Sequence, residues 1–201
     1  MQNPRECALD VLIKVDKKEE LSHIAISNVL EKYQFSEKRD RAFFTRLVEG
    51  TLERQITIDY VADQFSKTKI RKCKPLIRAL LRMGIYQILY MDQVPDSAAC
   101  NEAVKLAKKR GFSRLSGFVN GVLRTISREK ETFVFTDWSR KYSMPDWIIE
   151  LWKQQYPAET VERMMQAFLE ERPTCVRCNL DRASMEQILA SLEQDRVTVQ
   201  R

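Results

Sequence analysis

The chain has 201 residues, of which 44% are hydrophobic and 31% are charged, and its formal net charge is +6. This composition is typical of a soluble globular protein with a sizeable core. The first ten residues carry acids and no apolar run, and no stretch of about 18 apolar residues occurs, which excludes a signal peptide and a membrane-spanning helix. A cytoplasmic location is therefore expected. The five cysteines are odd in number and irregularly spaced, which favours reduced, buried thiols.

Apolar residues recur every three to four positions along residues 4–130, a spacing that predicts a run of amphipathic helices. Pro75 suits a first helical turn, and Gly111 is expected to end a helix. Because β-branched alternation is almost absent, the segment is predicted to be an all-α bundle of about seven helices joined by short loops. The predicted helices cover residues 4–15, 21–33, 36–52, 56–65, 74–90, 98–109 and 114–127.

The character of the sequence changes after residue 132, where tryptophans and prolines become frequent. Pro145 and Pro157 introduce two further helices, Pro173 ends the second of them, and Ser184 with Gln187 forms a capping box for a third. The segment is predicted to contain, in order, helices at 146–155 and 158–171, a strand at 175–180, a helix at 184–195 and a strand at 197–199.

The last predicted strand is interrupted by the end of the sequence at residue 201. A strand without partners is not stable, so the sequence is expected to be part of a longer protein. The predicted organisation is a helical domain at 1–132, linker helices at 133–172, and the truncated start of a small α/β subdomain at 173–201.

The charge is concentrated in two windows that contain no acidic residue. Residues 67–91 and 103–128 hold seven basic residues each, so the rest of the chain has a net charge of −8. A polyanion is the natural partner for such a distribution. The alternative is that the windows are solvated helix faces, although such faces usually intersperse acids with their lysines.

In the first window, Arg78 and Arg82 lie four residues apart, on the helix face opposite Leu76 and Leu80. Lys74 falls on the same side, and further basic residues stand just before the helix. A basic helix start joined to a basic loop is suited to a phosphate backbone.

In the second window, Gly117 and Gly121 lie one turn apart inside a predicted helix. Each costs roughly 1 kcal/mol relative to alanine, so the close approach of another backbone is expected there. That backbone is either a neighbouring helix or a nucleic-acid strand. Asn120 and Arg124 share the polar face, where they can meet a phosphate or a base edge.

Catalytic machinery is not predicted in this sequence. The five glycines form no G-x-G pair, and none follows a predicted strand, so no nucleotide or S-adenosylmethionine site of the strand–loop–helix kind is expected. His23, the only histidine, is best read as structural. Cys175 and Cys178 form a CxxC without the two further ligands that zinc requires and without a helix start for a redox thiolate. No metal site is predicted.

Several segments together resemble the N-terminal, NusB-like region of the RsmB (Sun/Fmu) family of ribosomal RNA methyltransferases. The resemblance extends over essentially the whole chain. The segments that carry it are Asn3–Arg5, Asp40–Phe44, Leu47–Arg54, Leu81–Met91, Asn101–Val104 and Phe118–Arg124, followed by Tyr142, Pro145, Trp147, Arg177 and Asn179.

The resemblance implies an enzyme that methylates C5 of a cytosine in 16S ribosomal RNA, with S-adenosylmethionine as its cofactor. In that family the catalytic cysteines lie in a later domain, one of them after a proline, and this sequence has no Pro-Cys pair. The 201-residue chain is therefore expected to be non-catalytic and to bind no cofactor itself. NusB begins with an arginine-rich segment, whereas here Arg5 stands beside Glu6 and Asp10, so the two basic windows are the preferred contacts.

The function predicted from the sequence is RNA binding that positions the substrate of a methyltransferase. Two alternatives are a non-enzymatic antitermination factor like NusB and a helical protein-interaction module whose basic faces are incidental. The expected partner is small-subunit ribosomal RNA, with a ribosomal protein as a further candidate and neither membrane nor DNA. The predicted RNA-binding residues are Arg5, Lys69, Arg71, Lys72, Lys74, Arg78, Arg82, Lys105, Lys108, Lys109, Arg110, Arg114, Asn120 and Arg124.

Overall fold

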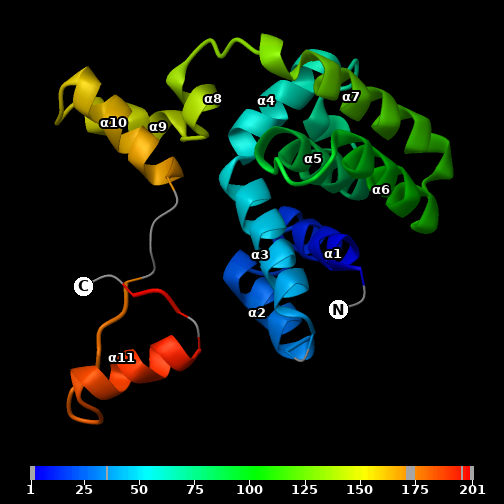
Figure 1. Cartoon of the computed structure of the whole chain (residues 1–201). Coiled ribbons are helices and arrows are strands. Elements are labelled where there is room, and N and C mark those ends of the chain that lie inside the picture. Colours follow the sequence, from blue (N-terminus) through cyan, green and yellow to red (C-terminus); the bar gives the residue numbers. More distant parts are fainter. Residues whose placement is uncertain (1–2, 35, 171–174, 196, 200–201) are drawn as a thin grey trace. The chain divides into compact units, whose positions relative to one another are not determined.

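The computed structural model describes residues 3–34, 36–170, 175–195 and 197–199. Among these residues, the predicted all-α bundle of seven helices is confirmed, and three short 3-10 turns join some of them (Figure 1). The α-helices are α1 (Pro4–Asp16), α2 (Ser22–Lys32), α3 (Lys38–Glu53), α4 (Gln55–Phe65), α5 (Pro75–Tyr90), α6 (Asp96–Lys109) and α7 (Ser116–Glu129). The 3-10 turns are η1 (Ile70–Lys72), η2 (Ser113–Leu115) and η3 (Lys130–Thr132).

The helix ends follow from local chemistry. The Asn3 side chain accepts a hydrogen bond from the Arg5 backbone N–H at 3.0 Å, and Pro4 occupies the first turn of α1, where no N–H is needed. Gly111 has a positive φ of 81°, as expected of a glycine that ends a helix. The Phe112 N–H reaches the Ala107 carbonyl oxygen at 2.8 Å, which satisfies one of the last carbonyls of α6.

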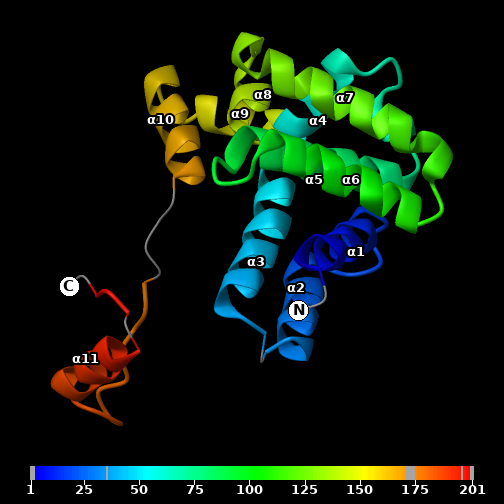
Figure 2. The same cartoon turned by 45° about the vertical axis from the view of Figure 1, so that its right-hand side comes forward.

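Helix α5 lies at the centre of the bundle, and α1, α3, α4, α6 and α7 all pack against it (Figures 1 and 2). Helices α1–α3 also pack on one another, as do α6 and α7. Consecutive residues of α5 are inaccessible to solvent because the helix is covered on several sides. The fully buried side chains include Leu9, Phe44, Leu47, Ile58, Ile77, Leu80, Leu81, Met83, Ile85, Leu123 and Ile126.

Two glycines permit close packing within this core. A Cβ atom added at Gly84 of α5 would lie 2.7 Å from a methyl carbon of Leu123 in α7. A Cβ atom added at Gly50 of α3 would overlap the phenol ring of Tyr86. Helix α5 therefore packs against α7, and α3 packs against α5, at distances that leave no room for a larger residue at either glycine.

Three further helices follow the bundle: α8 (Trp138–Tyr142), α9 (Asp146–Lys153) and α10 (Ala158–Leu169). The helices predicted after Pro145 and Pro157 are thus confirmed, whereas the expected role of Pro173 falls outside the described residues. Helix α8 is fixed to α4 by the Thr57 hydroxyl, which donates to the Arg140 carbonyl oxygen at 2.6 Å.

The chain divides into two compact units, residues 1–168 and 169–201. In the second unit, α11 (Met185–Gln194) begins with the predicted capping box, in which Ser184 Oγ accepts from the Gln187 N–H at 3.3 Å. The strands expected at 175–180 and 197–199 are not formed in the described residues. Val176 and Leu180 are 71% and 61% exposed, and the described part of the chain places no strand beside them that could complete a ladder.

Of the helices described, none is both long and apolar enough to cross a membrane.

Candidate nucleic-acid interface

The two arginines expected on an exposed face of α5 meet carboxylates instead. Arg78 Nη2 lies 2.5 Å from Asp16 Oδ2, at the end of α1, and Arg82 Nη1 lies 2.7 Å from Asp16 Oδ1. Arg82 also binds Asp59 of α4 with two hydrogen bonds of 2.7 Å. The side chains of Arg78, Arg82 and Asp16 are only 17%, 10% and 12% exposed. These four residues, called the ionic cluster below, join three helices.

The expectation that Arg82 presents its charge on an open helix face is therefore corrected. Helices α1 and α4 cover that face of α5, and they place the carboxylates of Asp16 and Asp59 against Arg82. Burial alone would raise the pKa of Asp16, but the hydrogen bonds and charges of Arg78 and Arg82 outweigh burial and lower that pKa. Asp16 consequently stays ionised at neutral pH, and the ion pairs of the cluster hold α1 and α4 against α5.

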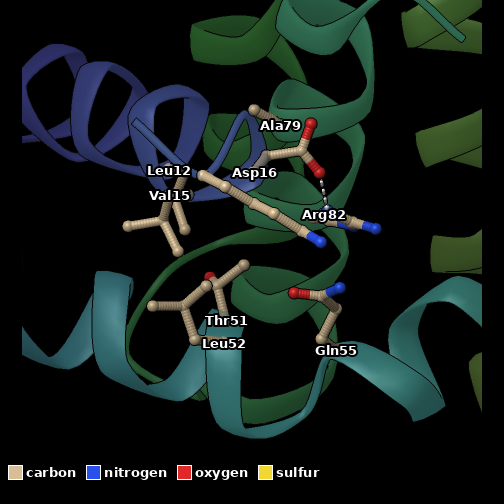
Figure 3. A pocket seen from close by; sticks show the side chains of 9 residues that line it. Leu12, Val15, Asp16, Thr51, Leu52, Gln55, Ala79 and Arg82 are labelled. Atoms are coloured by element: carbon tan, nitrogen blue, oxygen red, sulfur yellow. Dashed lines mark hydrogen bonds and ion pairs between the residues drawn. The ribbon is translucent and has the colours of Figure 1, made fainter. Parts of the chain in front are cut away.

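A small pocket of about 200 Å³ borders the ionic cluster (Figure 3). In it, Asp16 of α1 faces Arg82 of α5, while Thr51, Leu52 and Gln55 close the opposite side. Its arginine already has carboxylate partners, so the pocket offers no unpaired positive charge from α5 to an incoming phosphate.

Several other predicted RNA-binding residues also have partners within the bundle. Arg5 Nε donates to Gln87 Oε1 at 2.7 Å, and its guanidinium lies 4.7 Å from the centre of the Phe43 ring. Hydrogen bonding by Lys109 lowers the pKa of Glu6, as expected for a carboxylate that carries a local ion pair. The paired cations are Lys69 with Asp63, Lys105 with Glu102, Lys109 with Glu6, and Arg110 with Glu6 and Asp10.

Most of the predicted RNA-binding cations that have no carboxylate partner in the described residues lie where α5 begins and α6 ends. Lys74 Nζ lies 5.5 Å from the centre of the Phe112 ring, which places the start of α5 beside the turn that follows α6. Turn η2 packs against both α6 and α7, and these helices lie side by side with α5 in Figures 1 and 2. The exposed cations at this end have no acidic partner among the residues that the structure describes. We name this set the basic end: Arg71, Lys72, Lys74, Lys108 and Arg114.

The exposed face of α7 continues away from the basic end. Arg124 is exposed, and its Nε donates to Asn120 Oδ1 at 3.2 Å. Arg124 also lines a shallow groove of about 350 Å³ between α6 and α7, together with Arg128. Arg128 was not among the predicted site residues, although its spacing of four from Arg124 places both on one helix face.

The two glycines of α7 lie on this same exposed face. A Cβ atom added at Gly117 or Gly121 would meet nothing within 4 Å. The sequence left two explanations for these glycines, a neighbouring helix and a nucleic-acid strand. Close packing of a neighbouring helix does not account for them. The approach of a nucleic-acid strand stays a prediction.

The thiols of the bundle are not arranged for nucleophilic chemistry. Burial raises the pKa of Cys7, Cys73 and Cys100, so these side chains are protonated at neutral pH. Within the described ranges, no group of three or more His, Cys, Asp or Glu side chains is placed to hold a metal ion.

Comparison with known proteins gives two family matches, which lie on either side of residue 132, where the composition of the sequence changes. Residues 2–128 match the NusB family, and residues 144–201 match the Methyltr_RsmF/B-like ferredoxin-like domain. Transcription antitermination protein NusB of Bacillus velezensis is 36% identical over 129 residues, which are 64% of this chain and 95% of that protein. A solved structure of NusB from T. maritima has a TM-score of 0.58 at 23% identity, over 65% of this chain and 94% of the other.

Other relatives match both segments at once. A probable ribosomal RNA small subunit methyltransferase B of Bacillus subtilis is 32% identical over 98% of this chain and 45% of its own length. A second, from Synechocystis, is 33% identical over 98% of this chain and 46% of its length. The crystal structure of PH0851 has a TM-score of 0.68 at 20% identity, over 98% of this chain and 46% of that one. The chain thus belongs to the NusB family, and its NusB segment is followed by a segment that matches the RsmF/B-like ferredoxin-like domain, so that it is similar over 98% of its length to ribosomal RNA small subunit methyltransferases B.

Proposed function

We propose that this chain is the RNA-binding region of an S-adenosylmethionine-dependent, cytoplasmic methyltransferase, and that it positions 16S ribosomal RNA for methylation at C5 of a cytosine. The observation that carries this proposal is the basic end, whose five exposed cations have no carboxylate partner among the described residues. Its organisation would be the helical domain at 1–132, the linker helices at 133–172 and the start of an α/β subdomain at 173–201.

The proposed RNA surface consists of the basic end and the exposed face of α7. Cations without a neighbouring carboxylate attract a phosphate most strongly, because no local charge offsets theirs. Asn120, Arg124 and Arg128 would extend the surface along α7, and the open glycines beside them would let a nucleic-acid backbone come close. Arg5, which is bonded to Gln87, and the paired cations Lys69, Lys105, Lys109 and Arg110 would contribute less, and Arg78 and Arg82 would make no direct contact.

Methyl transfer is proposed for the whole protein only, since the chain spans about half the length of the curated methyltransferases it matches. The residues described here do not fit S-adenosylmethionine. Four of the five glycines lie within α3, α5 and α7, and Gly111 ends α6, so none lies in a loop between a strand and a helix. No catalytic step is therefore assigned to these residues.

An antitermination factor like NusB is the second candidate function. It is favoured by the 36% identity over 95% of the Bacillus velezensis NusB. A solved structure of antitermination factors NusB and NusE in complex with dsRNA also shares the fold. Its TM-score is 0.55 at 23% identity, over 64% of this chain and 98% of that one. On that alternative, a protein partner would bind the RNA together with this chain. Residues 144–201 favour the methyltransferase, because they match a RsmF/B-like domain.

Binding to a fragment of 16S ribosomal RNA at increasing salt concentration tests the proposed function. Five phosphate contacts are expected to give a log–log slope of about −3.5 to −4.5, because each neutralised phosphate contributes about 0.7 to 0.9. Fluorescence anisotropy with a labelled RNA measures the slope. Binding that is absent, or that does not weaken with salt, contradicts the proposal. Binding that requires an added ribosomal protein supports the antitermination alternative.

A further inference from the structure

One side chain links the ionic cluster to the basic end. Arg78 donates from Nε and Nη2 to Asp16, and from Nη1 to the backbone carbonyl oxygens of Arg71 at 3.0 Å and Cys73 at 3.4 Å. A single planar guanidinium therefore joins the end of α1 to the backbone of the turn that precedes α5. A lysine has no comparable fork, because its three donors share one nitrogen atom.

The turn from residue 69 to residue 74 is held at both ends. Its start is fixed by the buried side chain of Ile70, whose backbone N–H also donates to Asp63 Oδ1 at 2.6 Å. Its end is fixed by Arg78, which draws two carbonyl oxygens inward. The side chains of Arg71, Lys72 and Lys74 are left exposed on the outside of the turn.

Resting on the RNA-binding function proposed above, we propose that Arg78 is a positioning residue for RNA binding. It orders the turn that carries three of the five cations of the basic end, and it makes no contact with RNA itself. Four of its five N–H donors are already engaged and its side chain is 17% exposed, so little of it is open to a phosphate. A turn that is ordered before binding does not have to be ordered by the RNA.

The test compares Arg78→Gln and Arg78→Lys with Arg82→Gln, which breaks the same kind of ion pair with Asp16 without touching the turn. Both Arg78 variants are expected to bind 16S RNA about tenfold more weakly, which corresponds to ordering the backbone of roughly one residue. Their log–log salt slope should stay as in the wild type, because the same phosphates are contacted in the complex. Backbone amides of Lys72 and Cys73, bonded to Lys69 and Ile70, should exchange faster with solvent.

Arg82→Gln should lower stability yet leave both the RNA affinity and these two amides unchanged. A Lys72→Gln/Lys74→Gln variant is the positive control, since it should lower the salt slope by about 1.4 to 1.8. If this control weakens binding while both Arg78 variants bind normally, the positioning role is overturned and the RNA-binding function stands. A salt slope lowered by about 0.7 to 0.9 in the Arg78 variants would show direct phosphate contact instead. If the wild-type protein does not bind RNA, both the positioning role of Arg78 and the proposed RNA-binding function are overturned.

Discussion

Replacing Asp16 with asparagine is expected to lower the free energy of unfolding by about 3 kcal/mol. The change leaves Arg78 without its carboxylate partner and Arg82 with Asp59 alone. Because these side chains are largely buried, water compensates poorly for the lost charge. Urea denaturation at neutral pH measures the loss. Asp10→Asn is the matched control: Asp10 is 48% exposed where it pairs with Arg110, so its removal should cost less than about 1 kcal/mol.

The same carboxylate predicts how stability depends on pH. Burial would raise the pKa of Asp16, but the two arginines lower it overall, so folding favours the ionised form. Its contribution to stability is complete above the unfolded pKa of about 3.9 and is lost as the pH falls through the lower folded value. Wild-type protein should therefore lose this contribution only below about pH 4, and Asp16→Asn should lose less there. An Asp16→Asn protein as stable as the wild type at neutral pH would contradict the role of the ionic cluster.

Replacing Gly50 with alanine is expected to destabilise the fold by about 3 kcal/mol, because the new methyl group would overlap the ring of Tyr86. Tyr86 is 5% exposed and packed between helices, so its ring has no open direction in which to move. Thermal or urea unfolding measures the effect. Gly121→Ala is the control with the opposite sign: its methyl group meets nothing within 4 Å, so better helix propensity should stabilise the protein by roughly 0.5 to 1 kcal/mol.

A double-mutant cycle separates overlap from other effects of the Gly50 substitution. In a Tyr86→Leu background the shorter side chain leaves room, so Gly50→Ala should cost clearly less than in the wild type. Equal costs in both backgrounds would mean that the ring of Tyr86 is not the reason. A Gly121→Ala protein as unstable as Gly50→Ala would show that α7 is not open at this position.

The sequence predicts the helices well because their pattern is local. The apolar spacing of residues 74–90 marks α5 in full, and Gly111 marks the end of α6, since both depend only on neighbours along the chain. The capping box at Ser184 is confirmed for the same reason. Strands depend on partners elsewhere, which explains why 175–180 reads as a strand in isolation and has no strand structure in the residues described.

The placement of the cations is only partly readable from the sequence. The window of residues 67–91 contains no acid, yet Asp16 and Asp59 reach Arg78 and Arg82 from other helices. Charge windows do not reveal such long-range pairs. The contact of Lys74 with Phe112 is likewise invisible in the sequence, although it is what brings the two windows together at one end of the bundle.

The central claim is that RNA binds at the basic end, and two variants of equal charge test it most directly. One carries Lys72→Gln, Lys74→Gln, Lys108→Gln and Arg114→Gln, which removes unpaired cations. The other carries Lys69→Gln, Lys105→Gln, Lys109→Gln and Arg110→Gln, which removes cations that have carboxylate partners. Each lowers the formal net charge of +6 by four. The first should lower the log–log salt slope of 16S RNA binding by about 3, and the second should leave the slope near that of the wild type. Equal slopes for the two variants, or a wild-type slope in the first, would contradict this placement.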